Sequence, residues 1–100
     1  MPGAPGDIYL CTVYVRGHVA RPENVSLTIK WHDPKGAWFE EAPNQSVPMP
    51  QAEVKDWTPL SIMFTMPKGA GYAVIMLAGN DMKPEDVAYF DDCSVKQLRQ

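Results

Sequence analysis

The sequence predicts an all-β fold, and two observations carry that prediction. Ten prolines and seven glycines interrupt the 100-residue chain at short intervals, which is typical of short strands joined by turns. Between these breaks, apolar and polar residues alternate with a period of two, and no stretch has the period of an amphipathic helix. We therefore expect an antiparallel β-sandwich or barrel of about six strands.

Length and charge narrow the class of protein further. One hundred residues correspond to one domain, residues 1–100, with residues 1–7 as a flexible leader. The apolar content of 45% argues against disorder. The formal net charge is −3 and the basic residues are dispersed, so we expect neither nucleic acid nor a membrane surface as a partner. The longest apolar stretch, residues 72–79, is too short to span a bilayer.

Two strands are predicted in the first third of the chain. Residues 8–16 are rich in Ile, Val, Thr and Tyr, and they place on one face Tyr9, Cys11, Val13 and Val15. A loop over residues 17–23 follows. Residues 24–33 alternate most strictly, with Trp31 on the apolar face. Trp31 is therefore expected in the core.

The middle of the chain predicts a hairpin and then a loop. Residues 33–36, Asp-Pro-Lys-Gly, form a turn. Residues 37–42 would return as the partner strand, in which the neighbours Trp38 and Phe39 point to opposite faces. Residues 43–50 contain three prolines and are predicted to be a loop.

Three further strands are predicted in the second half of the chain. A strand begins at Val54 and alternates up to Met66, with Pro59 near its start. Residues 72–78 are apolar on both faces, which predicts a central, fully buried strand. A polar loop precedes the last strand, residues 87–98, which Asp91 and Asp92 interrupt.

Cys11 and Cys93 both lie in apolar strand patterns. We favour two buried free thiols. The alternative, a disulfide, needs their Cα atoms within about 7 Å. Neither cysteine has a second Cys or His at zinc-ligand spacing.

Four segments together resemble one family. They are GDIYLCTVYVRG, VSLTIKWHDPKGAWFEE, VKDWTPLSIMFTMPKGAGYAVIMLAGN and VAYFDDCSVKQL, in this order. The chain resembles the jelly-roll carbohydrate-binding modules of the xylan- and β-glucan-binding, galactose-binding-domain-like group. The family's first strands, with a Gly-Phe-Glu-like segment, have no counterpart before Ile8, so the resemblance implies a truncated jelly-roll.

The resemblance also implies a function. The chain would be a noncatalytic, extracellular module that binds a polysaccharide or oligosaccharide and targets an attached enzyme to it. Asp91 and Asp92 would hold part of a structural calcium site, or would instead cap backbone N–H groups of a neighbouring loop. A missing strand leaves a sheet edge open, which suggests a homodimer. The alternative is a structural or protein-interaction sandwich without sugar affinity.

Sugar binding requires flat apolar side chains together with hydrogen-bonding groups. We select as ligand-binding candidates Tyr14, Arg16, Trp38, Asn80 and Asp81. Their structural alternatives are a solvated sheet face for Tyr14 and Arg16, and a plain turn for Asn80 and Asp81. Trp57, which matches the family's strand-opening Trp, is expected to be mainly structural.

The chain contains no recognisable catalytic motif. His18 and His32 have no nucleophile in a suitable context. Glu40 and Glu41 are neighbours on a predicted strand, so their carboxylates face apart, unlike a glycosidase pair. We therefore expect no enzymatic activity, with a small hydrolase as a minor alternative.

Overall fold

The structure of this chain is a computed structural model, which describes residues 4–99. Within that range the strands are β1 (Ile8–His18), β2 (Val25–His32), β3 (Gln45–Pro48), β4 (Glu53–Thr65), β5 (Tyr72–Gly79) and β6 (Val87–Arg99). A short 3-10 helix, η1 (Pro22–Asn24), precedes β2. Residues 1–3 of the predicted leader lie outside the described residues. Next to them, the Gly6 N–H donates to the Met66 carbonyl at 3.0 Å.

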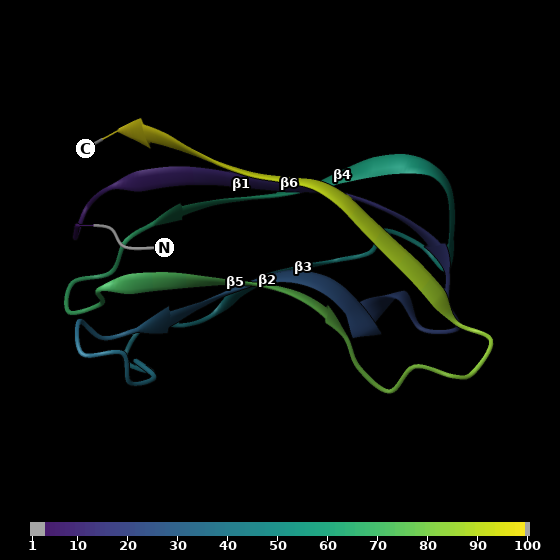
Figure 1. Cartoon of the computed structure of the whole chain (residues 1–100), viewed down its shortest axis with the longest axis horizontal. Helices are drawn as coiled ribbons and strands as arrows, with labels where there is room; N and C mark the ends of the chain where they lie inside the picture. The colour runs from purple at the N-terminus through teal and green to yellow at the C-terminus, as the bar shows by residue number, and fades with distance from the viewer. Residues whose placement is uncertain (1–3, 100) are drawn as a thin grey trace.

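The strands form two three-stranded antiparallel sheets, ordered β4-β1-β6 and β3-β2-β5. Figure 1 shows them as two layers, with β1, β4 and β6 above β2, β3 and β5. The prediction of an all-β fold with antiparallel sheets is confirmed, and the arrangement is compatible with a β-sandwich. The jelly-roll connectivity remains a prediction.

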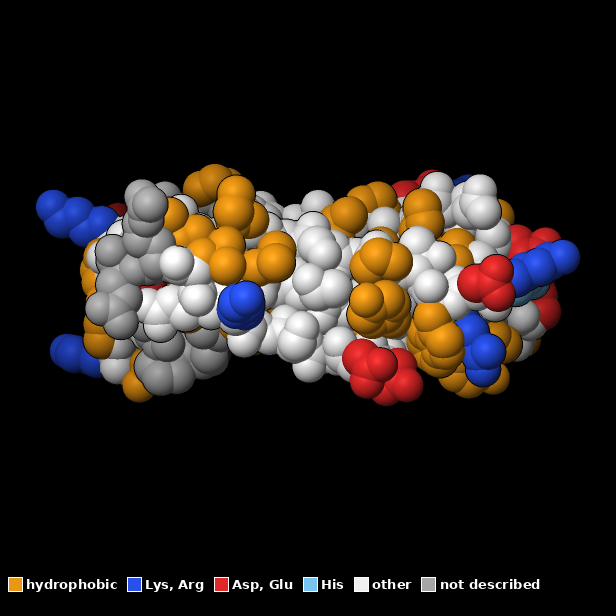
Figure 2. All heavy atoms as spheres, turned by 90° about the horizontal axis from the view of Figure 1, so that it is seen from above, with side chains coloured by type: hydrophobic (Ala, Val, Ile, Leu, Met, Phe, Trp, Pro, Cys, Tyr) orange, Lys and Arg blue, Asp and Glu red, His pale blue; other side chains and the backbone are white. Residues whose placement is uncertain are grey.

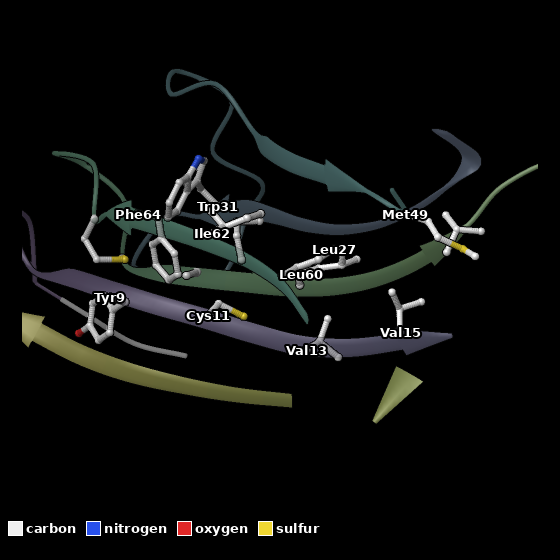
Figure 3. Packing of buried hydrophobic residues seen from close by; sticks show 14 of the residues in the cluster. Tyr9, Cys11, Val13, Val15, Leu27, Trp31, Met49, Leu60, Ile62 and Phe64 are labelled. Atoms are coloured by element: carbon white, nitrogen blue, oxygen red, sulfur yellow. The ribbon is translucent and has the colours of Figure 1, made fainter. Parts of the chain in front are cut away.

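The core lies between the two sheets and follows the alternation in the sequence. The face of β1 predicted to be apolar is buried throughout, from Tyr9 to Val15. Phe64 of β4 is the centre of an aromatic group (Figure 3). The Tyr9 ring stacks on the Phe64 ring with 5.5 Å between the ring centroids, and the Trp31 ring meets it edge-on with 5.7 Å between the centroids. Burial of each such side chain stabilises the fold by roughly 1.5–3 kcal/mol. The prediction that Trp31 belongs to the core is confirmed.

The predicted partner strand over residues 37–42 is wrong. Only a single bridge, from His32 to Trp38, remains of that hairpin, and β2 pairs instead with β3, inside the segment predicted to be a loop. The Asp33 carboxylate explains the difference, because it accepts the N–H groups of Lys35 and Ala37 at 2.9 and 3.0 Å and holds a wide turn. β3 tolerates Pro48 because it is an edge strand and Pro48 is its last residue.

The prediction that residues 72–78 form a central, fully buried strand is also wrong. β5 is an edge strand, and two of its large side chains, Tyr72 and Leu77, are exposed. A strand that is apolar on both faces is buried only if neighbours cover both faces and both edges. Here the flank of the sandwich at β5 is open.

The predicted interruption of the last strand at Asp91 and Asp92 is confirmed as a β-bulge. The pairing of β1 with β6 shifts between Thr12 and Tyr14, so that two residues, Asp92 and Cys93, stand opposite Val13. Asp92 adopts a φ of +52°, a conformation that Asp tolerates better than most residues. In the part of the chain described here, no helix is long and apolar enough to cross a membrane.

Candidate functional site

The outward face of β1 carries the first two predicted site residues. Val13 and Val15 are buried, so alternation turns Tyr14 and Arg16 to the opposite, solvent side. Both are exposed. The structure therefore brings these two candidates together on one face.

Two residues that sequence reasoning did not select flank Arg16 on the neighbouring strands. The Arg16 guanidinium carbon lies 4.7 Å from the ring centroid of Trp57 on β4 and 5.5 Å from that of Tyr89 on β6. These distances are within the range of a cation–π interaction. We call the group of Tyr14, Arg16, Trp57 and Tyr89 the Arg16 platform.

Irregular pairing positions Trp57. Val15 pairs with Thr58 and Gly17 pairs with Val54, so three β4 residues stand opposite Arg16 alone. The local bulge turns Trp57 toward Arg16, whereas Tyr89 is the direct cross-strand partner of Arg16. The expectation that Trp57 is mainly structural stays a prediction; its side chain is 40% exposed and lies beside Arg16.

The aromatic residues of the platform remain accessible to solvent. Tyr14 is 38% exposed, Trp57 40% and Tyr89 54%. Figure 2 looks onto the outer face of the β4-β1-β6 sheet and shows hydrophobic side chains gathered toward its two ends, with a mostly polar band between them. A depression of about 420 Å³ adjoins the platform, and its lining includes Arg16, Val54, Val87 and Tyr89. The platform thus combines exposed rings, a cation and a shallow recess.

The chemistry that this surface offers is stacking and hydrogen bonding. Aromatic faces accept the C–H-rich side of a flat ligand, and a guanidinium and phenol hydroxyls supply donors around its rim. Arg16 has no acidic partner among the ion pairs of the described residues. Its N–H donors are therefore available to a neutral polyhydroxyl ligand.

The third candidate, Trp38, lies elsewhere. It packs edge-on against His32 at 4.2 Å, with the Lys30 ammonium 5.7 Å from its ring centroid. Because Trp31 points into the core, Lys30 and His32 lie on the outward face of the β3-β2-β5 sheet. Trp38 is exposed, as predicted, and Phe39 is partly buried against the core. Trp38 nevertheless shares no surface with Tyr14 and Arg16.

The loop candidates Asn80 and Asp81 follow β5. The Asn80 N–H donates to the Asn24 carbonyl at 2.8 Å, and Asp81 adopts a φ of +50°. Both side chains are exposed. Asn80 is therefore tied to the segment before β2, Asp81 lies at a bend, and neither side chain is part of the Arg16 platform.

Asp91 and Asp92, the predicted calcium ligands, are both exposed at the bulge. The bulge leaves both side chains in solvent. The Asp91 carboxylate accepts the N–H of Asp92 at 2.8 Å. Among residues 4–99, no group of three or more His, Cys, Asp or Glu side chains is positioned to hold a metal ion. Calcium takes six to eight oxygen ligands, so this pair alone provides only part of a site.

Both cysteines are free thiols, as predicted, but only Cys11 is buried. Burial, together with the neighbouring Cys93, raises the pKa of Cys11 to about 11. Cys93 is exposed to solvent on β6.

One signal in the sequence could have found the two residues that were missed. In β4 the buried residues Leu60, Ile62 and Phe64 occupy even positions, so the odd-numbered Trp57 belongs to the outer face. In β6, Ala88 and Phe90 pack against the core and Tyr89 alternates with them.

No protein-family model, curated protein or solved structure matches this chain.

Proposed function

We propose that this domain binds carbohydrate, without cleaving it, through the Arg16 platform. One observation carries the proposal: two exposed aromatic rings, Trp57 and Tyr89, flank the Arg16 guanidinium, and a third exposed ring, Tyr14, lies on the same outer face of β1. Sugar rings stack on such faces, and their hydroxyls accept hydrogen bonds from the guanidinium. The resemblance to jelly-roll carbohydrate-binding modules supports the same function. An attached enzyme would thereby gain a higher effective concentration at an extracellular polysaccharide.

The platform also has a purely structural alternative, in which Arg16 only bridges β4 and β6. An exposed cation–π contact stabilises a fold by about 0.5–1 kcal/mol. For this stabilising role the rings of Trp57 and Tyr89 are sufficient. The arrangement here includes a third exposed ring, Tyr14, and an adjoining recess. These two features serve a ligand rather than the stability of the sheet, and they favour binding.

Binding to soluble xylan, β-glucan and mannan tests the proposal by affinity electrophoresis and calorimetry. We expect Trp57→Ala to weaken binding at least about tenfold, a loss of about 1.4 kcal/mol. Trp38→Ala is the matched control, since it removes an exposed indole from the other sheet. Loss of binding in Trp38→Ala alone would move the site to the other face. Absence of binding by folded wild-type protein would refute the sugar hypothesis.

Thermal unfolding with added calcium and with a chelator tests the calcium site that the resemblance implies. If calcium stabilises the domain through Asp91 and Asp92, the melting temperature rises with calcium. The double substitution Asp91→Asn with Asp92→Asn should then abolish the rise. An equal response in the double variant would place the ion elsewhere.

A further inference from the structure

One flank of the sandwich exposes residues that point into its interior. On β6, Val95 pairs with Cys11 and therefore shares its inner face. Cys11 is completely buried, whereas Val95 is 37% exposed. On β5, Leu77 pairs with the buried Leu27 and yet is 42% exposed. We call this side, formed by β5 and β6, the open flank.

The backbone edge of β6 is also uncovered. β6 has 13 residues and, within the described chain, pairs with β1 alone. It contains no proline, whereas the two edge strands of the opposite side carry Pro48 in β3 and Pro59 in β4. Proline on an edge strand blocks pairing with another chain because it lacks an N–H. β6 has no such protection and therefore presents free donors and acceptors to a further strand.

The charges of β6 indicate which strand fits there. Acidic Asp91 and Asp92 precede Ser94, and basic Lys96 follows it. An antiparallel copy of β6 centred on Ser94 places Cys93 opposite Val95 of the second copy on the inner face. Because Asp92 and Cys93 share one position in the bulge, this register also places Asp91 opposite Lys96 of that copy. Both pairings occur twice because of the two-fold symmetry, so the strand is complementary to itself in shape and in charge.

We propose that β6 pairs with β6 of a second copy of this chain and joins the two β4-β1-β6 sheets into one sheet of six strands. The interface is isologous, as in most dimers, and it covers the inner-face residues of the open flank. A two-fold axis perpendicular to the sheet also leaves both outer faces on the same side. If the Arg16 platform binds sugar, as proposed above, the dimer would present two platforms to one glycan surface; the dimer itself does not depend on that function.

Sedimentation velocity from low micromolar to near-millimolar protein tests the dimer. We expect a reversible monomer–dimer equilibrium. Lys96→Glu should weaken it at least about tenfold, because two attractive pairs become repulsive. The triple variant Asp91→Lys, Asp92→Lys, Lys96→Glu should restore it. Lys68→Glu, in the exposed turn after β4, makes the same charge change away from β6 and should leave the equilibrium unchanged.

A cross-linking experiment tests the register. In a Cys93→Ala background, Ser94→Cys places one accessible thiol at the two-fold axis. Exchange with oxidised glutathione would join the two thiols in an inter-chain disulfide and release two molecules of reduced glutathione. Ser61→Cys in the same background is the control, since it lies on the exposed face of β4. We expect a covalent dimer for Ser94→Cys only.

Two outcomes would overturn the proposal. A folded wild-type protein that stays monomeric near millimolar concentration has no such interface. Equal cross-linking of the Ser61 and Ser94 variants shows random collision rather than pairing of β6. Either result leaves the sugar titration unaffected, so the failure of one proposal does not imply the failure of the other.

Discussion

The strands β4 and β6 invite comparison because both have 13 residues and both pair with the central strand β1. The inner-face residues of β4 are buried, from Leu60 to Phe64, whereas those in the second half of β6 are exposed. The difference lies in the second sheet: β4 lies against β3 and β2, whereas β6 packs mainly against its neighbour β1. Alternation decides which way a side chain points, and only the opposite layer decides whether it is buried.

The largest difference between the two flanks should appear in large-to-small substitutions. Phe64→Ala removes the centre of the aromatic group under β4 and should lower the free energy of unfolding by about 3–5 kcal/mol. Val95→Ala, on the open flank, should cost less than about 1 kcal/mol in the monomer. Urea denaturation at low protein concentration measures both. Similar losses would mean that the two flanks are equally well packed.

The attachment of β6 to β1 should be sensitive to Gly17. A Cβ at Gly17 would collide with the Val87 carbonyl oxygen and lie 2.8 Å from the Ala88 Cα. We expect Gly17→Ala to destabilise the protein by roughly 1–3 kcal/mol and to speed amide exchange at the start of β6. Gly79→Ala is the control, since its Cβ would lie 3.5 Å from the Met82 Cγ, an ordinary contact. An equally mild effect of the two substitutions would contradict the close approach of the strands.

The buried Cys11 thiol should make stability depend on pH at the alkaline end. The pKa of Cys11 is raised in the folded protein to about 11, from an ordinary value of 9.0. The buried thiol therefore favours folding fully below pH 9.0, and this contribution is lost as the pH rises through about 11. We expect the midpoint of urea unfolding to fall over that window in wild type and less in Cys11→Ala.

Thiol modification at neutral pH tests the difference in exposure between Cys11 and Cys93. The exposed Cys93 should react with iodoacetamide in the folded protein, whereas the buried Cys11 should react only after unfolding. Mass spectrometry of the labelled protein distinguishes the two. Rapid labelling of Cys11 would show that β6 opens readily.

The smallest expected effect on stability is that of Arg16→Ala. Its guanidinium is exposed, so the loss of two cation–π contacts should cost about 0.5–1 kcal/mol. Lys30→Ala, which removes the cation near Trp38, is the matched control. If Arg16→Ala abolishes sugar binding at this small cost, the platform serves a ligand. A cost above about 2 kcal/mol would favour the structural alternative.

Much of the fold could be predicted, because its signals are local. Alternation located β1, β2, β4 and the last strand, and it assigned Trp31 to the core. The partner of β2 could not be predicted in this way. The wide turn held by Asp33 ends the hairpin, and β3 forms in a proline-rich segment that has no strand signal of its own.

The candidate site likewise contains residues that a local pattern predicts and residues that only the pairing of strands brings together. Tyr14 and Arg16 were predicted because they are two residues apart on one strand. Trp57 and Tyr89 lie 41 and 73 residues after Arg16 in the sequence (57 − 16 and 89 − 16). They contact Arg16 only because three strands pair and because β4 contains a bulge. Trp38 satisfied the chemical criteria but lies on the other sheet, which no local pattern distinguishes.

The sequence by itself therefore determined the class of fold, the direction in which most strand residues point and the place of Trp31 in the core, since each depends on neighbours a few positions apart. The tertiary structure alone decided which strands pair, how a bulge in β4 and the pairing of β6 bring Trp57 and Tyr89 to Arg16, and which flank stays open. These depend on contacts between distant segments, because strand order is selected by the total burial and hydrogen bonding of the whole chain.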